Sequence, residues 1–283
     1  MAGNQARCAI AYTLYVPYSK ALPKMDRYLT ALQARRVEAV RHFPGWDVRL
    51  YLDGRFTKEM AGVIRKLGYT VVHLPPSNRS LPEWHHVSSR LRVIDDPDVD
   101  VFMMRDLDSA LSPRDAISVW VWLSSGVEFH SMHDNPAHSD VLMAGMWGGR
   151  SEAARRRFAP RGIDAFLAEA AANVDHRGND QLLLAKAVWP HIEGNTLHMD
   201  MSQAWCRYDG KLCAPFPMTP HSGQVIDGFV GEVVASKALM PRPVDVECKA
   251  LAEGLDKTAV FEEADLQQQW VKDAWPRMRS FCN

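Results

Sequence analysis

Val-Asp-Val-Phe-Met-Met-Arg-Asp-Leu-Asp-Ser, residues 99–109, is the stretch that decides the fold. Val101 to Met104 form an apolar run of the length expected for a buried strand. Asp106 and Asp108 follow at the point where that strand should give way to a loop. Carboxylates are almost never buried unpaired, so two of them at a strand end need cations. A divalent metal that bridges a diphosphate would satisfy them, and Arg105 beside them could bind the same anion.

Apolar runs with the periods of strands and helices alternate on both sides of this stretch. We expect strands over 8–15, 47–52, 69–74, 101–104, 127–132 and 141–147. We expect helices over 24–42, 58–67, 87–94, 112–123, 151–172 with a break at Pro160, and 179–188 ending at Trp189-Pro190. Such alternation predicts an α/β fold, with a mainly parallel sheet between helices on both faces. From His191 onward the pattern is less regular and rich in proline, and we expect this part to wrap the sheet and to end in a helix over 261–275.

The pair Asp106 and Asp108 is expected where open α/β sheets bind ligands, beyond the carboxyl ends of the strands. The two common glycine-rich phosphate cradles are absent from the sequence. A nucleotide bound here would therefore need a metal, rather than a glycine loop, to hold its diphosphate.

Composition narrows the classes of function. The 283 residues carry a net charge of -1, from 33 basic and 34 acidic residues, and 47% are hydrophobic. This balance disfavours bulk binding to a nucleic-acid backbone. Five arginines between 150 and 161 form a local exception, either as a solvated helix face or as a contact with DNA.

The cysteines and the N-terminus suggest where the protein is found. Five scattered cysteines without a Cys-x-x-Cys pair predict neither a zinc site nor a disulfide framework. The N-terminus is polar, and no apolar run reaches the ~18 residues of a membrane span. We expect a soluble, cytoplasmic protein.

Three segments, in this order, resemble the GT-A class of nucleotide-sugar glycosyltransferases, distantly the glycogenin-type enzymes. Phe102 to Ser109 resembles the Asp-x-Asp motif, and 129–147 resembles the strands on the acceptor side. Gly178-Asn179-Asp180-Gln181 resembles the start of the Asp-Gln helix. The resemblance covers about residues 8–235 and implies a single GT-A (Rossmann-like) domain over 1–283. Within it, 1–110 would be the nucleotide-binding half, 111–235 the acceptor and catalytic half, and 236–283 a C-terminal wrap and helix.

The resemblance also implies roles on the donor side. Asp106 would contact the ribose and the metal, Asp108 would hold the metal, and the ion would be Mn²⁺ or Mg²⁺, which prefer such hard oxygen ligands. His198 is the preferred third ligand, and His221 is the other candidate. Further donor contacts are expected from Arg90, Arg105, Tyr12 and Asp53.

On the acceptor side, Asp180 is the expected catalytic residue. It would act as a general base in an inverting enzyme, or stabilise the sugar cation in a retaining one. It could also simply cap the helix that follows it. The remaining substrate contacts are expected from His133, Asp134, Gly145, Trp147 and Asn179.

These features predict a metal-dependent hexosyltransferase that moves a sugar from a nucleotide sugar, with a UDP-sugar favoured, to a glycan or another hydroxyl acceptor. A nucleotidyltransferase or phosphotransferase is an alternative, because such enzymes also use close pairs of acids. A carbohydrate-binding relative without activity is a third reading. A modified DNA base stays open as the acceptor.

Overall fold

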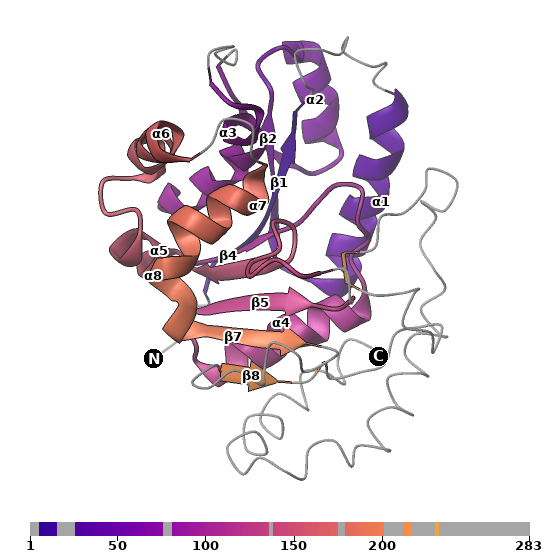
Figure 1. Ribbon diagram of the computed structural model, residues 1–283. Coiled ribbons are helices and arrows are strands. Elements are labelled where there is room, and N and C mark those ends of the chain that lie inside the picture. The colour runs from indigo at the N-terminus through magenta and orange to yellow at the C-terminus, as the bar shows by residue number, and fades with distance from the viewer. Residues whose placement is uncertain are drawn as a thin grey trace, which may run out of the picture.

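A computed structural model describes residues 6–15, 26–75, 81–135, 138–174, 179–200, 212–214, 216 and 230–231 (Figure 1). In these residues eight strands form one sheet in the order β3-β2-β1-β4-β6-β5-β7-β8. Strand β6 is antiparallel to both of its neighbours, and the other pairs are parallel. The strands are β1 (Cys8–Leu14), β2 (Asp47–Leu52), β3 (Thr70–His73), β4 (Val101–Met104), β5 (Phe129–His133), β6 (Trp147–Arg150), β7 (Thr196–Asp200) and β8 (Leu212–Ala214). The predicted fold class, a mixed and mainly parallel α/β sheet flanked by helices, is confirmed.

Helices cover both faces of the sheet. One face carries α1 (Asp26–His42), α2 (Lys58–Lys66) and α4 (Pro113–Ser125). The other carries α3 (Glu83–Val87), the 3₁₀ segment η1 (Ser88–Asp95), α5 (Ser151–Arg157), α6 (Ile163–Asn173), α7 (Asp180–Leu183), the π-helical η2 (Leu184–Val188) and α8 (Trp189–Ile192). A short 3₁₀ turn, η3 (Glu193–Asn195), leads into β7.

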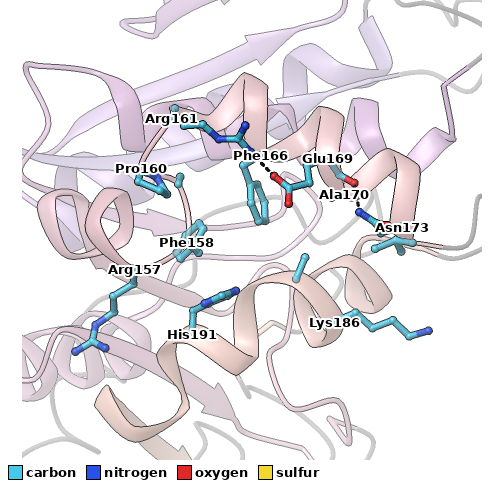
Figure 2. A pocket seen from close by; sticks show the side chains of 14 residues that line it. Arg157, Phe158, Pro160, Arg161, Phe166, Glu169, Ala170, Asn173, Lys186 and His191 are labelled. Carbon is cyan, nitrogen blue, oxygen red and sulfur yellow. Dashed lines mark hydrogen bonds and ion pairs between the residues drawn. The ribbon is translucent and has the colours of Figure 1, made fainter.

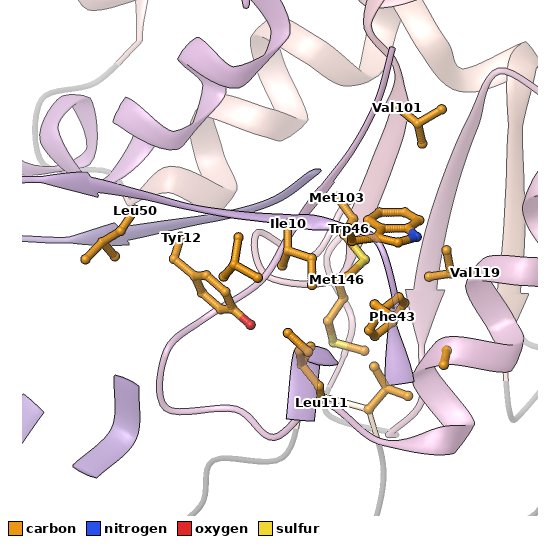
Figure 3. Packing of buried hydrophobic residues seen from close by; sticks show 14 of the residues in the cluster. Ile10, Tyr12, Phe43, Trp46, Leu50, Val101, Met103, Leu111, Val119 and Met146 are labelled. Carbon is orange, nitrogen blue, oxygen red and sulfur yellow. The ribbon is translucent and has the colours of Figure 1, made fainter. Parts of the chain in front are cut away.

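Side chains of one strand alternate between the two cores, as the pleat requires. Ile10 and Tyr12 of β1 belong to the core that also contains residues of α1 and α2, and Figure 3 shows the two side chains on the same side of the strand. Ala9 and Ala11 of the same strand face the opposite core. Helix α4 starts as its sequence predicts, because Ser112 accepts a hydrogen bond from the amide of Asp115 at 3.1 Å and Pro113 follows the cap.

The strand expected over 141–147 is wrong. Residues 141–146 form turns, and the strand is Trp147–Arg150, which contains both glycines that were expected to end it. Crowding explains the glycines: a Cβ at Gly148 would lie 2.4 Å from the carbonyl of Phe102, and one at Gly149 would lie 2.4 Å from the ring of Phe129. Strand propensity disfavours glycine, but close packing between β4 and β5 requires it here.

The predicted break around Pro160 is confirmed, because residues 151–172 form two helices. Three other expectations need correction. The helix from Asp180 does not end at Trp189-Pro190 but continues to Ile192 through a π-helical turn. Strands β7 and β8 were not expected in the proline-rich part. Cys213 is disulfide-bonded, against the expectation from the cysteine spacing. The helix predicted over 261–275 lies outside the described residues.

Candidate active site

One edge of the sheet, where β1, β2 and β4 end, gathers most of the charged residues singled out in the sequence. The loop after β4 carries Asp106 and Asp108, and η1 brings Arg90 to the same edge. The amide of Arg90 donates to Thr13 Oγ1 of β1 at 3.1 Å, which fixes η1 against that strand. The topology therefore places these side chains as the position of the Asp-x-Asp pair predicts.

Arg90 links the two carboxylates that the sequence predicted as metal ligand and catalytic residue. Its guanidinium is buried, with 5% of the side chain exposed, and contacts Asp106 Oδ1 at 2.5 Å and Asp180 Oδ2 at 3.4 Å. It also donates to the carbonyl of Arg105 at 2.8 Å. Burial alone would lower the pKa of Arg90, but Asp106 and Asp180 reverse this and raise it. One fixed cation thus joins η1, the loop after β4 and the start of α7.

The surroundings of Asp180 and Asp108 disfavour the ionised form of each carboxyl group. Desolvation raises the pKa of Asp180 against the opposing effect of Arg90, and Asp106 raises it further. Desolvation followed by repulsion from Asp106 raises the pKa of Asp108, although this residue lies at the surface. Asp108 and Asp180 both lie near the carboxylate of Asp106. The negative charge that the three groups carry when ionised favours a bound cation.

Two side chains of helix α1 form hydrogen bonds with the backbone of the loop that carries Asp106 and Asp108. The amide of Leu111 donates to Glu38 Oε2 at 2.8 Å, and Arg35 donates to the carbonyl of Leu107 at 3.4 Å. Arg35 and Glu38 are themselves paired at 2.6 Å and buried. The loop therefore has a rigid support on its inner side.

The turn before β6 lies directly against Asp106. A Cβ at Gly145 would lie 2.1 Å from Asp106 Oδ2, so only glycine fits at this position. Gln181, next to Asp180, accepts a hydrogen bond from the amide of Ala144 at 2.7 Å. Asn179 caps α7, with its Oδ1 accepting from the amide of Leu182 at 3.1 Å. The expected substrate contacts Gly145 and Asn179 are thus placed beside Asp106 and Asp180.

A cavity of about 230 Å³ lies at the same edge, beyond the ends of β1 and β2. Thr13, Tyr15, Asp53, His86 and Ser89 are among the residues that line it. The rings of Tyr15 and His86 are stacked at 5.1 Å. Its volume lies below the ~300–1,000 Å³ of sites for whole ligands, so it suits one part of a ligand, such as a base or a ribose. Asp53 also lines the cavity, and Arg55 holds its carboxylate at 2.9 Å.

Asp106 and Asp108 fit a divalent cation through their chemistry. Mg²⁺ and similar ions commonly bind through one or two carboxylates and complete their shell with substrate phosphates and water. Arg90 neutralises part of Asp106, while Asp108 forms no ion pair with the residues that the structure describes, and its pKa is raised. Among the described residues no group of three or more His, Cys, Asp or Glu is arranged to hold a metal. A third protein ligand is therefore not preformed in this part of the chain.

Three residues expected to contact the donor or acceptor point into the protein instead. Tyr12 is fully buried in the core under α1. Trp147 is buried on the opposite face, edge-on to Phe102 at 5.5 Å. Arg105 turns away from the site and pairs with Asp115 of α4 at 2.7 Å. Tyr12 and Trp147 pack in the two cores, and Arg105 forms a buried ion pair. The linear sequence does not show these contacts.

The expected ligands His133, Asp134 and His198 are also buried. Asp134 pairs with Arg114 through a bond of 2.6 Å and accepts from the amide of Val230 at 2.8 Å. His133 bonds the carbonyl of Asp140 at 2.8 Å. The ring of His198 lies 5.8 Å from that of His133, in the middle of β7, and does not join Asp106 and Asp108. The other candidate, His221, lies outside the described residues.

Sequence reasoning missed several residues of this edge. Gln181 was read only as part of a motif, yet it positions the turn beside Asp106. Thr13 and His86 carry no motif at all. Gly231, far along the chain, accepts a hydrogen bond from Ser109 at 3.3 Å, just after Asp108. Only the parallel strand order, which joins distant segments, could have indicated them.

Comparisons with known proteins give low similarity. No protein-family model matches the chain, and no curated protein matches it in sequence. The galactosyltransferase LgtC, in complex with donor and acceptor sugar analogues, is 14% identical with a TM-score of 0.42 over 69% of this chain and 73% of LgtC.

Two other solved structures are similar at the same level. A mannosyltransferase from Pyrobaculum calidifontis, in complex with GDP-Man and Mn²⁺, is 10% identical with a TM-score of 0.35 over 99% of this chain and 86% of its own. A 4-diphosphocytidyl-2C-methyl-D-erythritol synthase from Anaerococcus prevotii is 10% identical with a TM-score of 0.38 over 88% of this chain and 96% of its own. Such low scores assign no activity, so the function must be argued from the chain's own residues.

The described residues also bear on membrane association. None of their helices combines the length and the apolar character needed to cross a bilayer.

Proposed function

We propose that this chain is a metal-dependent glycosyltransferase that uses a nucleotide sugar, with a UDP-hexose as the favoured donor. One observation carries the proposal: buried Arg90 joins Asp106 and Asp180 at the carboxyl edge of the sheet. The cavity of Tyr15 and Asp53 opens at the same edge. A site with a place for a base or ribose, a place for a cation and a further carboxylate matches the parts of a nucleotide sugar.

Each residue has a role in this proposal. Asp106 and Asp108 hold Mn²⁺ or Mg²⁺ together with the donor diphosphate. The cation would supply positive charge that stabilises the departing nucleoside diphosphate. Arg90 fixes Asp106 in place, and Gly145 lets the backbone approach it closely. The cavity beside Thr13 and Ser89 receives the nucleoside.

Asp180 acts toward the acceptor in the same proposal. Its side chain is 21% exposed, so solvent or a hydroxyl can reach it, while Arg90 holds one of its oxygens. Burial raises the pKa of this carboxyl, which makes it a better proton acceptor once ionised. The acceptor in the proposal is a glycan or another hydroxyl compound.

Thermal unfolding with ligands tests the proposal. We expect UDP with Mn²⁺ to raise the melting temperature of the wild type, and Asp108→Asn to abolish this rise. Asp98→Asn is the matched control, because Asp98 is 76% exposed at the opposite end of β4 and pairs with Arg7. The rise should be retained in that control.

A donor screen then separates the classes of enzyme. Hydrolysis of UDP-, GDP- and ADP-sugars with Mn²⁺ should show turnover with one donor and a loss of turnover in Asp180→Asn. Failure of every nucleoside diphosphate to shift the melting temperature would sink the proposal. Release of pyrophosphate from a nucleoside triphosphate, without sugar transfer, would assign the site to a nucleotidyltransferase.

A further inference from the structure

A second and larger cavity lies away from the candidate active site. It has a volume of about 490 Å³ and lies between the α5–α6 connection, α6 and the continuous segment η2–α8 (Figure 2). It shares no lining residue with the cavity of Tyr15 and Asp53. The proposed function makes no use of it.

The inner surface of this cavity is apolar and aromatic. Phe158 and Phe166 line it with their rings 5.3 Å apart, and Ala170 and Ala187 are also part of the lining. Figure 2 shows His191 reaching up from α8 toward Phe158. A flat ring can pack against such a surface in an offset or edge-on arrangement with the two phenylalanine rings.

The rim of the cavity is cationic. Arg157, Arg161 and Lys186 contribute three positive charges and Glu169 one negative charge, which leaves +2 around a cavity in a chain of net charge -1. Arg157 shares its partner Glu128 with Arg156, so this acid does not cancel both arginines. The local charge favours an anion.

The remaining cations of the rim are available to a ligand. Arg161 pairs with Glu169 only through side chains that are 73% and 61% exposed, and such pairs are weak. Lys186 is exposed and forms no ion pair with any of the described residues. Its long flexible stem lets the ammonium move over the cavity.

The sequence explains why the cavity has this shape. Pro190 has no amide hydrogen, so it cannot donate to the carbonyl of Lys186 as the regular α-helical pattern requires. The helix widens instead, and the amide of Trp189 donates to the carbonyl of Leu184, five residues back. Single π-helical turns of this kind occur frequently at functional sites. This turn carries both Lys186 and Ala187 to the cavity.

We propose that this cavity binds a small anionic molecule that carries an apolar ring. The ring packs against Phe158 and Phe166, and the anionic group, a phosphate, sulfate or carboxylate, is held by Lys186 and Arg161. Arg161, one of the five arginines between 150 and 161, thereby acquires a role distinct from a DNA contact. The proposal does not depend on the glycosyltransferase assignment.

Phenyl phosphate is a suitable probe, with inorganic phosphate and phenol as its two halves. We expect saturable binding of phenyl phosphate by calorimetry, with a dissociation constant below about 1 mM, and at least about tenfold weaker binding of either half. The double variant Lys186→Met/Arg161→Met should weaken phenyl phosphate at least about tenfold, because both charge-assisted contacts are lost. Both side chains are exposed, so the fold should survive, which the melting temperature checks.

Controls separate this site from the other one. Lys66→Met, an exposed lysine in the last turn of α2, should leave the binding of phenyl phosphate unchanged. Asp108→Asn should also leave it unchanged, so failure here and failure of the proposed function are distinguishable. Equal binding by wild type and double variant, or no saturable binding, would overturn the proposal. So would salt-sensitive binding of a DNA duplex at these residues without any binding of phenyl phosphate.

Discussion

At the scale of single residues, Arg90 is a buried cation held between two acids. A guanidinium offers several donors in a fixed plane, so it can serve Asp106, Asp180 and a backbone carbonyl at once. The three donors of a lysine all leave one nitrogen, whereas Arg90 reaches Asp106 and Asp180 from two different nitrogens. Arg90 therefore determines how close the predicted metal ligand and the predicted catalytic carboxylate lie.

Replacing this arginine should destabilise the fold. Arg90→Met leaves two carboxylates without their shared cation, and we expect the free energy of unfolding to fall by about 3–5 kcal/mol. Because Arg90 holds down the pKa of Asp180, its removal raises that pKa further. A raised carboxyl pKa gives stability at low pH that is lost as the pH rises, so the deficit should be smaller at pH 4.5 than at pH 7.5.

Urea unfolding at the two pH values measures this effect. Arg161→Met, which breaks an exposed pair, is the control and should cost less than about 1 kcal/mol. An Arg90 variant with the same deficit at both pH values would show that the carboxylates do not depend on this arginine.

The contact of Gly145 with Asp106 makes a second prediction at this scale. Gly145→Ala places a methyl group where Asp106 Oδ2 lies, 2.1 Å from the new carbon, so the carboxylate or the turn must move. We expect a loss of about 1–3 kcal/mol of stability and of the melting-temperature rise with UDP and Mn²⁺. Gly62→Ala in α2, with no atom within 4 Å of the added carbon, should instead stabilise by about 0.5–1 kcal/mol. Retention of the full rise in Gly145→Ala would exclude the site geometry described above.

At the scale of elements, α4 is fixed to the sheet by two consecutive residues of its first turn. Arg114 pairs with Asp134 after β5, and Asp115 pairs with Arg105 after β4. All four side chains are buried. The start of α4 is therefore held at the ends of two strands, β4 and β5. The sequence analysis had assigned Arg105 and Asp134 to ligand contacts instead.

A double-mutant cycle tests whether Arg105 has this structural role. Asp115→Asn should cost about 3–5 kcal/mol, because it leaves Arg105 buried without its counter-charge. Arg105→Met/Asp115→Leu should recover most of that loss, because an apolar pair of similar volume needs no desolvation of charge. The double variant should keep the melting-temperature rise with UDP and Mn²⁺. Loss of that rise in a stable double variant would restore Arg105 as a donor contact.

The elements also show how much of the fold the sequence predicts. Period and apolar content predicted five of the eight strands in the described residues, and the strand of the Asp-x-Asp pair was placed correctly at Val101–Met104. The strand Trp147–Arg150 was misplaced because close packing against Phe102 and Phe129 requires its glycines, although glycine has a low strand propensity. The continuation past Pro190 was missed because a π-helical turn accommodates the lost amide donor.

The candidate site could be predicted only in part, for a related reason. Residues that follow a strand directly, such as Asp106, can be placed from the chain alone. Arg90 was expected to face the donor, and its contact with both acids depends on η1 lying against β1. The burial of Tyr12, His133 and His198 follows from which face of the sheet each residue occupies and which helix covers it. A linear pattern carries neither fact.

At the scale of the whole molecule, the two cores differ in chemistry from the edge between them. Both cores are apolar and closely packed, while the carboxyl edge concentrates acids whose pKa values are raised. The excess of positive charge gathers instead around the cavity between α6 and α8. The two proposed ligands, a metal-bound diphosphate at the acidic edge and a free anion at the cationic cavity, therefore have separate places on one near-neutral protein.

Buried histidines should set the acid stability of the whole chain. Burial lowers the pKa of His42 to about 4 and holds that of His130 well below its ordinary value. A lowered histidine pKa gives stability that is present above about pH 6.5 and is lost as the pH falls toward the folded value, because the unfolded chain binds the proton. For His42 the loss between pH 7.5 and 5 is about 2 kcal/mol. The raised pKa values of Asp108 and Asp180 act in the opposite direction and limit the loss of stability at the acid end.

Urea unfolding between pH 7.5 and 5 measures the contribution of His42. The stability of His42→Gln should decline less than that of the wild type, by about 2 kcal/mol. His191→Gln, an exposed histidine, should decline as the wild type does, and an unchanged slope in His42→Gln would mean that other groups control the acid transition.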